Sequence, residues 1–224
     1  MAAGEGVRLR PLTERWAKPV LPIDGRPVLA PLLRELAAAG VERCVVVIGH
    51  LAAQVEALVG DGSAFGLAVS FASQPRPDGS ADAVRRAGLE PPYVVVGADT
   101  LFRPGDVGRF AAGAEGFDGA IAVRREPPPK PPHRYAVGAV DGIVERVLDD
   151  VAANPLAGAP LWLIGPPVAE RLEGVPGPPF ELARAFQEAI DGGARVAAVE
   201  IGPTRDLTRP EDLVVENFPY LRGL

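Results

Sequence analysis

Through the first half of the chain, short apolar runs alternate with helical patterns. Cys44–Ile48 and Tyr93–Gly97 are continuous and Val-rich, which is typical of strands buried on both faces. Leu67, Val69 and Phe71 alternate with small or polar residues, as in a further strand. Helices are predicted at Val28–Ala39, Leu51–Val59 and Ser80–Ala87, and from Asp106 onward. This strand–helix alternation predicts an α/β fold with a mainly parallel sheet.

The later part of the chain predicts shorter elements. Strands are expected at Tyr135–Val140, Ile143–Leu148 and Val196–Ile201, and helices at Phe180–Ile190 and from Pro210. The proline-rich stretch at 126–133 cannot be regular structure and predicts a stiff connecting loop. No internal repeat is visible, so we expect a single domain over residues 1–224.

Composition narrows the class of protein. The chain is 47% hydrophobic and 23% charged, and no apolar run approaches the ~20 residues of a membrane span. No signal-peptide pattern stands at the N-terminus, so the cytoplasm is the expected compartment and no membrane partner is expected. Cys44 is the single cysteine and the two histidines are far apart. These counts exclude an internal disulfide framework and a Cys-based zinc site, and they argue against a His-rich metal site.

Charge points toward a small anionic ligand. A net charge of −6 argues against a nucleic-acid partner. Within residues 1–26, however, basic residues outnumber acidic ones; they are Arg8, Arg10, Arg15, Lys18 and Arg26. Only two lysines occur in the whole chain, and arginine fills nearly every other basic position. Lys18 is therefore a candidate for a site that needs a compact point charge rather than a planar fork.

The N-terminal stretch carries the candidate chemistry. A loop with Gly4 and Gly6 allows backbone N–H groups to approach phosphate oxygens closely. Arg8 could clamp phosphates in bidentate fashion, and Lys18 could add charge where it builds up at phosphorus. The spacing is neither the P-loop nor the dinucleotide pattern. From the residues alone, a phosphate-binding loop and an ordinary glycine-rich turn with solvated arginines both remain open.

Several motifs together resemble the sugar-1-phosphate nucleotidyltransferases, or NDP-sugar pyrophosphorylases. GEGVRLRPLT at 4–13 followed by KPVLPI at 18–23 resembles the N-terminus of glucose-1-phosphate thymidylyltransferases and mannose-1-phosphate guanylyltransferases. GDGSAFG at 60–66 and GSADA at 79–83 resemble further family segments in the right order. Asp99, Asp206 and Asn217 complete the series, so the resemblance covers essentially the whole chain.

The resemblance implies a fold and a reaction. The fold is a three-layer α/β/α sandwich with a Rossmann-like, mostly parallel mixed sheet of the nucleotide-diphospho-sugar transferase type. The implied reaction couples an NTP to a sugar 1-phosphate, releases pyrophosphate and gives an NDP-sugar. A pyrimidine nucleotide, dTTP or UTP, is favoured because Gln74 resembles the base-reading glutamine of those enzymes. Homo-oligomers are frequent in the family, so a homo-oligomer is an expectation here too.

The resemblance also implies three groups of site residues. The nucleotide-binding residues are Ala3, Gly4, Glu5, Gly6, Gln74, Gly79 and Ser80. The catalytic residues, which bind the phosphates at the reacting centre, are Arg8 and Lys18. The Mg²⁺ ligands are Asp99 and Asp206. Such chemistry needs positioning and charge stabilisation more than a covalent nucleophile, and Mg²⁺ prefers carboxylate oxygens. For Asp206, capping of the last helix is an equally good interpretation.

Two departures from the family pattern keep alternatives open. The family has a strand before its glycine loop, where this sequence has only Met1, so we expect a first strand to be missing or truncated. The family's sugar-side lysine has no counterpart in the segment Asp149–Pro155. The acceptor could therefore be another phosphorylated small molecule. A non-catalytic nucleotide-sugar-binding regulatory protein is a further alternative.

Overall fold

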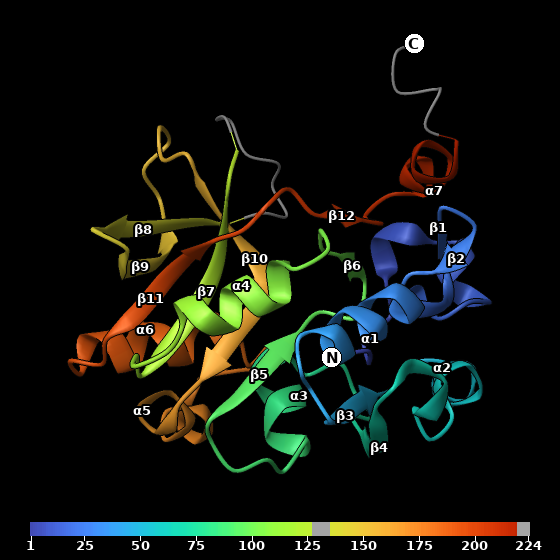
Figure 1. Ribbon diagram of the computed structural model, residues 1–224, viewed down its shortest axis with the longest axis horizontal. Coiled ribbons are helices and arrows are strands. Elements are labelled where there is room, and N and C mark those ends of the chain that lie inside the picture. The colour runs from blue at the N-terminus through green and yellow to red at the C-terminus, as the bar shows by residue number, and fades with distance from the viewer. Residues whose placement is uncertain (127–134, 219–224) are drawn as a thin grey trace. The chain divides into compact units, whose positions relative to one another are not determined.

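The computed structural model describes residues 1–126 and 135–218 (Figure 1). Its contacts group the described residues into two compact units. Unit 1 comprises residues 1–77, 97–107 and 204–218, and unit 2 comprises residues 78–96 and 108–203. The proline-rich loop expected at 126–133 lies almost wholly outside the described residues. Among the described residues, every helix is too short or too polar to cross a membrane.

Unit 1 is built around a pair of parallel strands. Its strands are β1 (Pro22–Ile23), β2 (Arg26–Pro27), β3 (Arg43–Ile48), β4 (Ala68–Ser73), β6 (Thr100–Leu101) and β12 (Arg205–Asp206). Its helices are α1 (Leu29–Ala38), α2 (Ala52–Val59) and α7 (Pro210–Asn217), with 3-10 turns η1 (Val7–Leu9), η2 (Leu12–Glu14), η3 (Lys18–Val20) and η4 (Ser63–Phe65). β3 and β4 pair in parallel register from Arg43↔Ala68 to Ile48↔Ser73. The predicted β3, β4, α1 and α2 are thereby confirmed within a residue or two at each end.

A hydrophobic cluster joins the two ends of the chain in unit 1. It consists of Leu9, Leu21, Ile23, Val28 and Leu207. All five are at most 5% exposed. Leu207 follows β12, which pairs antiparallel with β6, so the C-terminal segment supplies part of the core that the N-terminal turns need. Burial of such side chains contributes roughly 1.5–3 kcal/mol each.

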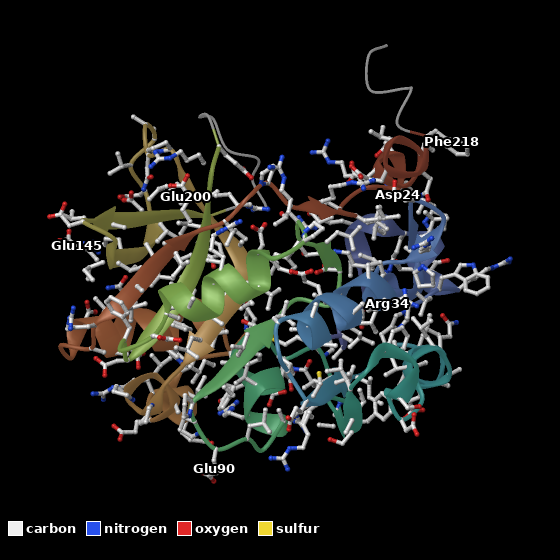
Figure 2. All side chains as sticks on the ribbon, viewed as in Figure 1. Asp24, Arg34, Glu90, Glu145, Glu200 and Phe218 are labelled. Atoms are coloured by element: carbon white, nitrogen blue, oxygen red, sulfur yellow. The ribbon has the colours of Figure 1, made fainter. Side chains whose placement is uncertain are left out.

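A two-residue turn between β1 and β2 is tied to α7. Asp24 and Gly25 have φ angles of 51° and 71°, the left-handed conformations that a tight hairpin turn requires. Arg205 donates from Nη2 to Asp24 Oδ1 at 2.8 Å and to the Glu216 carbonyl at 3.0 Å. Asn217 accepts the Gly25 N–H at 2.8 Å. Asp24 accordingly lies beside α7 in Figure 2.

Unit 2 contains a six-stranded sheet. Its strands are β5 (Tyr93–Val96), β7 (Gly119–Arg125), β8 (Ala136–Val140), β9 (Ile143–Asp149), β10 (Leu156–Ile164) and β11 (Val196–Glu200), in the order β5-β10-β7-β11-β9-β8. Its helices are α3 (Ser80–Arg86), most of α4 (Asp106–Gly113), α5 (Pro166–Ala169) and α6 (Leu182–Asp191), with the turn η5 (Leu172–Gly174). The amphipathic α6 buries Leu182, Ala185, Phe186 and Ala189.

The expectation of a mostly parallel sheet is wrong for the described strands. β7–β11 and β3–β4 are the parallel ladders between named strands there, and the remaining ladders are antiparallel. The physical reason lies in the connections. β8 and β9 are joined by Asp141 and Gly142, with φ angles of 50° and 78°, and a two-residue turn of this kind permits only antiparallel pairing. The sheet of unit 2 is therefore mixed.

The interior strand β10 was not predicted from the sequence. It pairs antiparallel with β5 and with β7, and a bridge from Ala157 to Ala136 links it to β8 as well. Its first half is made of small residues and carries Pro160, which falls where the register with β7 shifts between Gly158 and Trp162. Proline is tolerated at such an irregularity because no ladder hydrogen bond from its nitrogen is needed. The strand thus lacks the Val-rich signature of β3 and β5.

A partly buried tyrosine in unit 2 gives an expected dependence of stability on pH. The Tyr135 hydroxyl accepts a hydrogen bond from Trp162 Nε1 at 3.3 Å, and burial raises the pKa of Tyr135 to about 12. In the unfolded chain a tyrosine ionises with a pKa of about 10. The stability that comes from keeping Tyr135 neutral in the folded protein is therefore complete below pH 10. It is lost as pH rises toward 12, which lowers the free energy of unfolding by up to about 3 kcal/mol. Urea unfolding of Tyr135→Phe should show a shallower fall than wild type between pH 9 and pH 11.5. Two parallel curves would contradict this expectation.

Candidate active site

The glycine loop begins alongside β3. The Ala2 N–H donates to the Val47 carbonyl at 2.8 Å, and the Ala3 carbonyl accepts the His50 N–H at 3.2 Å. Ala3 is buried, whereas Gly4 is exposed and a Cβ added to it would meet nothing within 4 Å. The backbone at Gly4 is therefore open to an approaching ligand, as the phosphate-binding interpretation requires.

Gly6 turns the chain from this loop into η1. Its φ is 62°, and a Cβ there would lie 2.8 Å from Thr13 Cγ2, so both conformation and space require glycine. Its carbonyl accepts the Thr13 hydroxyl at 2.9 Å and the Leu9 N–H at 2.8 Å. Glu5, between the two glycines, pairs with Arg10 at 3.1 Å on the surface. The predicted loop is thus a rigid turn with an open backbone at its tip.

Lys18 lies at the first position of η3 and forms an ion pair with Asp99, through Nζ and Oδ2. Their side chains are 15% and 33% exposed. Burial by itself opposes ionisation of the Asp99 carboxyl, but the charge and hydrogen bond of the Lys18 ammonium outweigh it and hold the pKa of Asp99 below its ordinary value. Two of the predicted site residues, 81 positions apart, are therefore in direct contact.

The ladder between β6 and β12 brings the second predicted aspartate to the same place. Asp206 is opposite Thr100, the residue directly after Asp99. Thr208 donates its hydroxyl to Asp206 Oδ2 at 2.8 Å. The interpretation of Asp206 as a helix cap is not what the structure has: the carboxylate that accepts the Arg209 N–H at the start of α7 belongs to Asp212, at 2.7 Å. Asp206 therefore lies in the β6–β12 ladder opposite Thr100, the residue that follows Asp99.

The backbones of Gln74 and of the glycine loop come together at Gly49, a residue that was not predicted from the sequence. The Gln74 N–H donates to the Ile48 carbonyl at 2.7 Å, just past the end of β4, and the residue is only 4% exposed. A Cβ on Gly49 would lie 2.6 Å from the Gln74 carbonyl oxygen and 2.8 Å from that of Ala3. Gly49 is thus required where the two backbones converge, at the carboxyl ends of parallel strands, the usual place for ligands. The sequence feature that could have indicated Gly49 is its position directly after a buried strand.

Two predicted nucleotide-binding residues belong to unit 2 and have structural partners there. Gly79 has φ 117°, and a Cβ would lie 2.3 Å from the Phe180 carbonyl oxygen. The Ser80 hydroxyl accepts the Leu182 N–H at 2.7 Å and donates to Glu181 Oε2 at 3.0 Å. Both residues therefore join the start of α3 to the start of α6. The other predicted site residues all belong to unit 1.

Arg8 lies on η1 and is exposed. Its guanidinium makes no hydrogen bond or ion pair with any other residue that the structure describes. Unlike Arg10, which is engaged by Glu5, it is available to an incoming anion. The predicted phosphate-binding pair thus consists of one available guanidinium and one ammonium already paired to a carboxylate.

Comparison with solved structures identifies the class of fold. A putative glucose-1-phosphate thymidylyltransferase from Bacillus anthracis superimposes with a TM-score of 0.82 over 100% of this chain and 94% of that chain, at 17% sequence identity. At this identity the likeness shows the fold alone. The chain therefore has the α/β fold with mixed sheets of the nucleotide-diphospho-sugar transferases.

Sequence comparison then gives the family: the chain belongs to the nucleotidyl transferase family, whose model matches residues 1–143. Glucose-1-phosphate thymidylyltransferase of Streptomyces antibioticus is 29% identical over 252 residues, covering 100% of this chain and 66% of the relative. CMP-5'-(3-aminopropyl)phosphonate synthase of Streptomyces rubellomurinus is 35% identical over 155 residues, covering 67% of this chain and 24% of the relative. The chain thus spans about two thirds or less of the length of these relatives.

Proposed function

We propose that this protein is a magnesium-dependent nucleotidyltransferase that couples an NTP to a sugar 1-phosphate and releases pyrophosphate. The observation that carries the proposal is the Lys18–Asp99 ion pair with Asp206 at the neighbouring ladder position, in the unit that also holds the glycine loop. Membership of the nucleotidyl transferase family supports the reaction type. The thymidylyltransferase relative supports a sugar 1-phosphate acceptor and, together with the position of Gln74, a pyrimidine nucleotide such as dTTP or UTP.

The chain's own residues have distinct tasks in this reaction. The open backbone around Gly4 would receive phosphate oxygens, and Arg8 would clamp them from η1. Lys18 would stabilise the charge that develops on the α-phosphate during in-line attack by the acceptor phosphate oxygen. That oxygen is already anionic, so no general base is required. Positioning and charge stabilisation, rather than covalent chemistry, account for the residues found.

The residues present fit a Mg²⁺ ion. Asp99, directly before β6, and Asp206, on the paired strand β12, offer two carboxylates, and Mg²⁺ is commonly held by one or two carboxylates together with substrate phosphates and water. When bound, Mg²⁺ would neutralise negative charge on the phosphate oxygens. Asp99 is ionised because the Lys18 ammonium keeps its pKa low, so one ligand is ready in the form that a cation needs.

A second acceptor class is favoured by one comparison. The relative from Streptomyces rubellomurinus is named for a CMP-linked aminopropylphosphonate, and it is 35% identical to this chain over 155 residues. In the segment Asp149–Pro155, where no lysine occurs, Asn154 closes the turn by donating to the Val137 carbonyl at 3.0 Å and accepting the Leu156 N–H at 2.8 Å. An acceptor phosphate or phosphonate other than a sugar 1-phosphate, with CTP as donor, is therefore the second candidate.

We further propose how the protein is organised. The chain would form one nucleotidyltransferase domain with a three-layer α/β/α arrangement. Gly79 and Ser80 would bind nucleotide in addition to making the structural contacts described above. The protein would act in the cytoplasm as a homo-oligomer. Size-exclusion chromatography with light scattering tests the last point, and a monomer at micromolar concentration would overturn it.

The experiment that tests the function is pyrophosphate release with Mg²⁺. The four common NTPs and dTTP are crossed with a panel of sugar 1-phosphates and with short alkyl phosphates and phosphonates. We expect rapid release with one donor–acceptor pair and none after chelation of Mg²⁺. Release with no pair, while an NTP still raises the melting temperature, would overturn the enzyme proposal in favour of a nucleotide-sugar-binding regulatory protein.

A further inference from the structure

Gln54 on α2 holds the backbone just before Lys18. Its side-chain Oε1 accepts the Ala17 N–H at 2.8 Å, and its Nε2 donates to the Arg15 carbonyl at 2.7 Å. The amide therefore bridges the two peptide groups on either side of Trp16, from 37 residues further along the chain. Neither bond belongs to a helix or a sheet ladder.

The bridge leaves Lys18 little freedom at its Cα. Ala17 is 1% exposed, and its N–H is bound by Gln54 while its carbonyl accepts the Val20 N–H at 2.9 Å. On the other side, Pro19 is buried and fixes its own φ within η3. Lys18 is thus clamped between an anchored residue and a proline. Its ammonium is delivered to Asp99 from a backbone that cannot shift unless the Gln54 bonds break.

The connection between β3 and α2, which contains His50, holds the backbone earlier in the chain at Thr13. His50 Nε2 lies 2.7 Å from the Thr13 carbonyl oxygen, and the His50 N–H donates to the Ala3 carbonyl. The connection after β3 therefore contacts both the glycine loop, at Ala3, and the chain that leads to Lys18, at Thr13. Gln54, on the helix that follows, binds the backbone directly before Lys18.

We propose that Gln54 is the positioning residue for Lys18: its side-chain amide fixes the peptide groups at Arg15 and Ala17 so that the Lys18 ammonium is held at Asp99. The catalytic meaning of this assignment rests on the proposed nucleotidyltransferase function, whereas the positioning itself does not. Gln54 need not touch substrate. A displacement of about 1 Å in a reacting group can lower turnover by about 100-fold. The Gln54 amide can therefore affect the rate of nucleotidyl transfer without touching the substrate.

The chain offers a matched control in unit 2. Gln187 on α6 accepts the Val147 N–H at 3.0 Å and donates to the Glu145 carbonyl at 3.2 Å. It thus makes the same bridge, between residues two apart, to a backbone N–H of a fully buried residue. Replacing either glutamine by methionine removes this pair of bonds at similar side-chain length, and at Gln187 it also removes the bond from Nε2 to Asp191 Oδ1 at 2.9 Å. Only Gln54 is expected to act on Lys18.

The first test measures how fast the Lys18 side chain is acylated in the ligand-free protein. Lys18 is one of only two lysines in the sequence, so its acylation by a dilute N-hydroxysuccinimide ester can be followed by peptide mass mapping. We expect Gln54→Met to label Lys18 at least about threefold faster than wild type, because the local backbone opens more often, and Gln187→Met to label it at the wild-type rate. Gln54→Glu, which keeps the acceptor for Ala17, should lie between. An unchanged rate in Gln54→Met, or an equal rise in Gln187→Met, would overturn the proposal.

The second test separates positioning from general destabilisation. Where wild type releases pyrophosphate, Gln54→Met should lower kcat by about 10–100-fold with little change in KM for the NTP. In a Lys18→Ala background the same change should have no further effect, since residues that act through one another are not additive. Additive losses would overturn the assignment. If wild type is inactive, the nucleotidyltransferase function fails while the labelling result still decides whether Gln54 positions Lys18.

Discussion

Replacing Lys18 by alanine is expected to lower kcat for pyrophosphate release by about 10²–10³-fold or more, with NTP binding weakened but retained. Lys18 brings a compact positive charge to the Asp99 carboxylate, through their ion pair. Its loss removes the charge that stabilises the transition state and leaves a half-buried carboxylate without its counter-charge. The measurement is steady-state pyrophosphate release with saturating Mg²⁺.

Two further variants sharpen this result. Lys18→Arg keeps the charge but replaces a compact ammonium with a planar fork, so only a small part of the activity should return. Arg125→Ala removes a positive charge from an exposed pair with Glu200, and exposed pairs of this kind contribute about 0–1 kcal/mol, so its turnover should match wild type. Turnover of Lys18→Ala within about 10-fold of wild type would show that Lys18 is not catalytic.

Replacing Gly79 by alanine is expected to destabilise the protein by about 4 kcal/mol or more, enough to unfold a large fraction of it. The residue has φ 117°, which disfavours any side chain. In addition, a Cβ would lie 2.3 Å from the Phe180 carbonyl oxygen and 2.4 Å from its nitrogen. These are backbone atoms, so they cannot move aside without displacing the starts of both α3 and α6. Urea denaturation followed by circular dichroism measures the change.

Gly88→Ala separates the two causes. Gly88 also has a positive φ, 61°, but a Cβ there would meet nothing within 4 Å. We expect Gly88→Ala to lower the free energy of unfolding by about 1–2 kcal/mol, the cost of the left-handed backbone conformation alone. Equal losses at Gly79 and Gly88 would show that the close approach to Phe180 is relieved cheaply. In that case a glycine at position 79 would have to be explained by the nucleotide rather than by packing.

The elements that the sequence predicted well are those with a strong local signature. β3 and β5 are uninterrupted apolar runs, and α1 carries leucines at helical spacing that the structure buries. β10 was not predicted because its first half, after Leu156, consists of small residues and a proline, whereas its pairing with β5 and β7 involves residues far away in the sequence. The antiparallel character of β8 and β9 was readable from the Asp-Gly pair at 141–142, which the sequence analysis did not use.

The candidate site shows a similar division. The Lys18–Asp99 contact and the neighbouring position of Asp206 agree with the order of motifs along the chain, although the roles of these residues remain predictions. Gly49 and Gln54 were missed because each acts on a backbone far away in sequence, through a close approach or a side-chain hydrogen bond. Such contacts leave no periodic pattern. A glycine directly after a buried strand was the available hint for the first, and nothing local marked the second.

The three-part construction of unit 1 has a consequence for how the protein is made. Leu207 completes a cluster whose other members, among them Leu9, Leu21 and Val28, are synthesised first. Unit 1 receives no further chain between residues 107 and 204. At typical translation rates this interval lasts about 5–20 s. Throughout this interval the nascent chain has an incomplete apolar cluster and only one of the two aspartates proposed as Mg²⁺ ligands. Ribosome-bound chains are therefore expected to depend on chaperones until β12 emerges, and a candidate metal site cannot assemble before β12 has been synthesised.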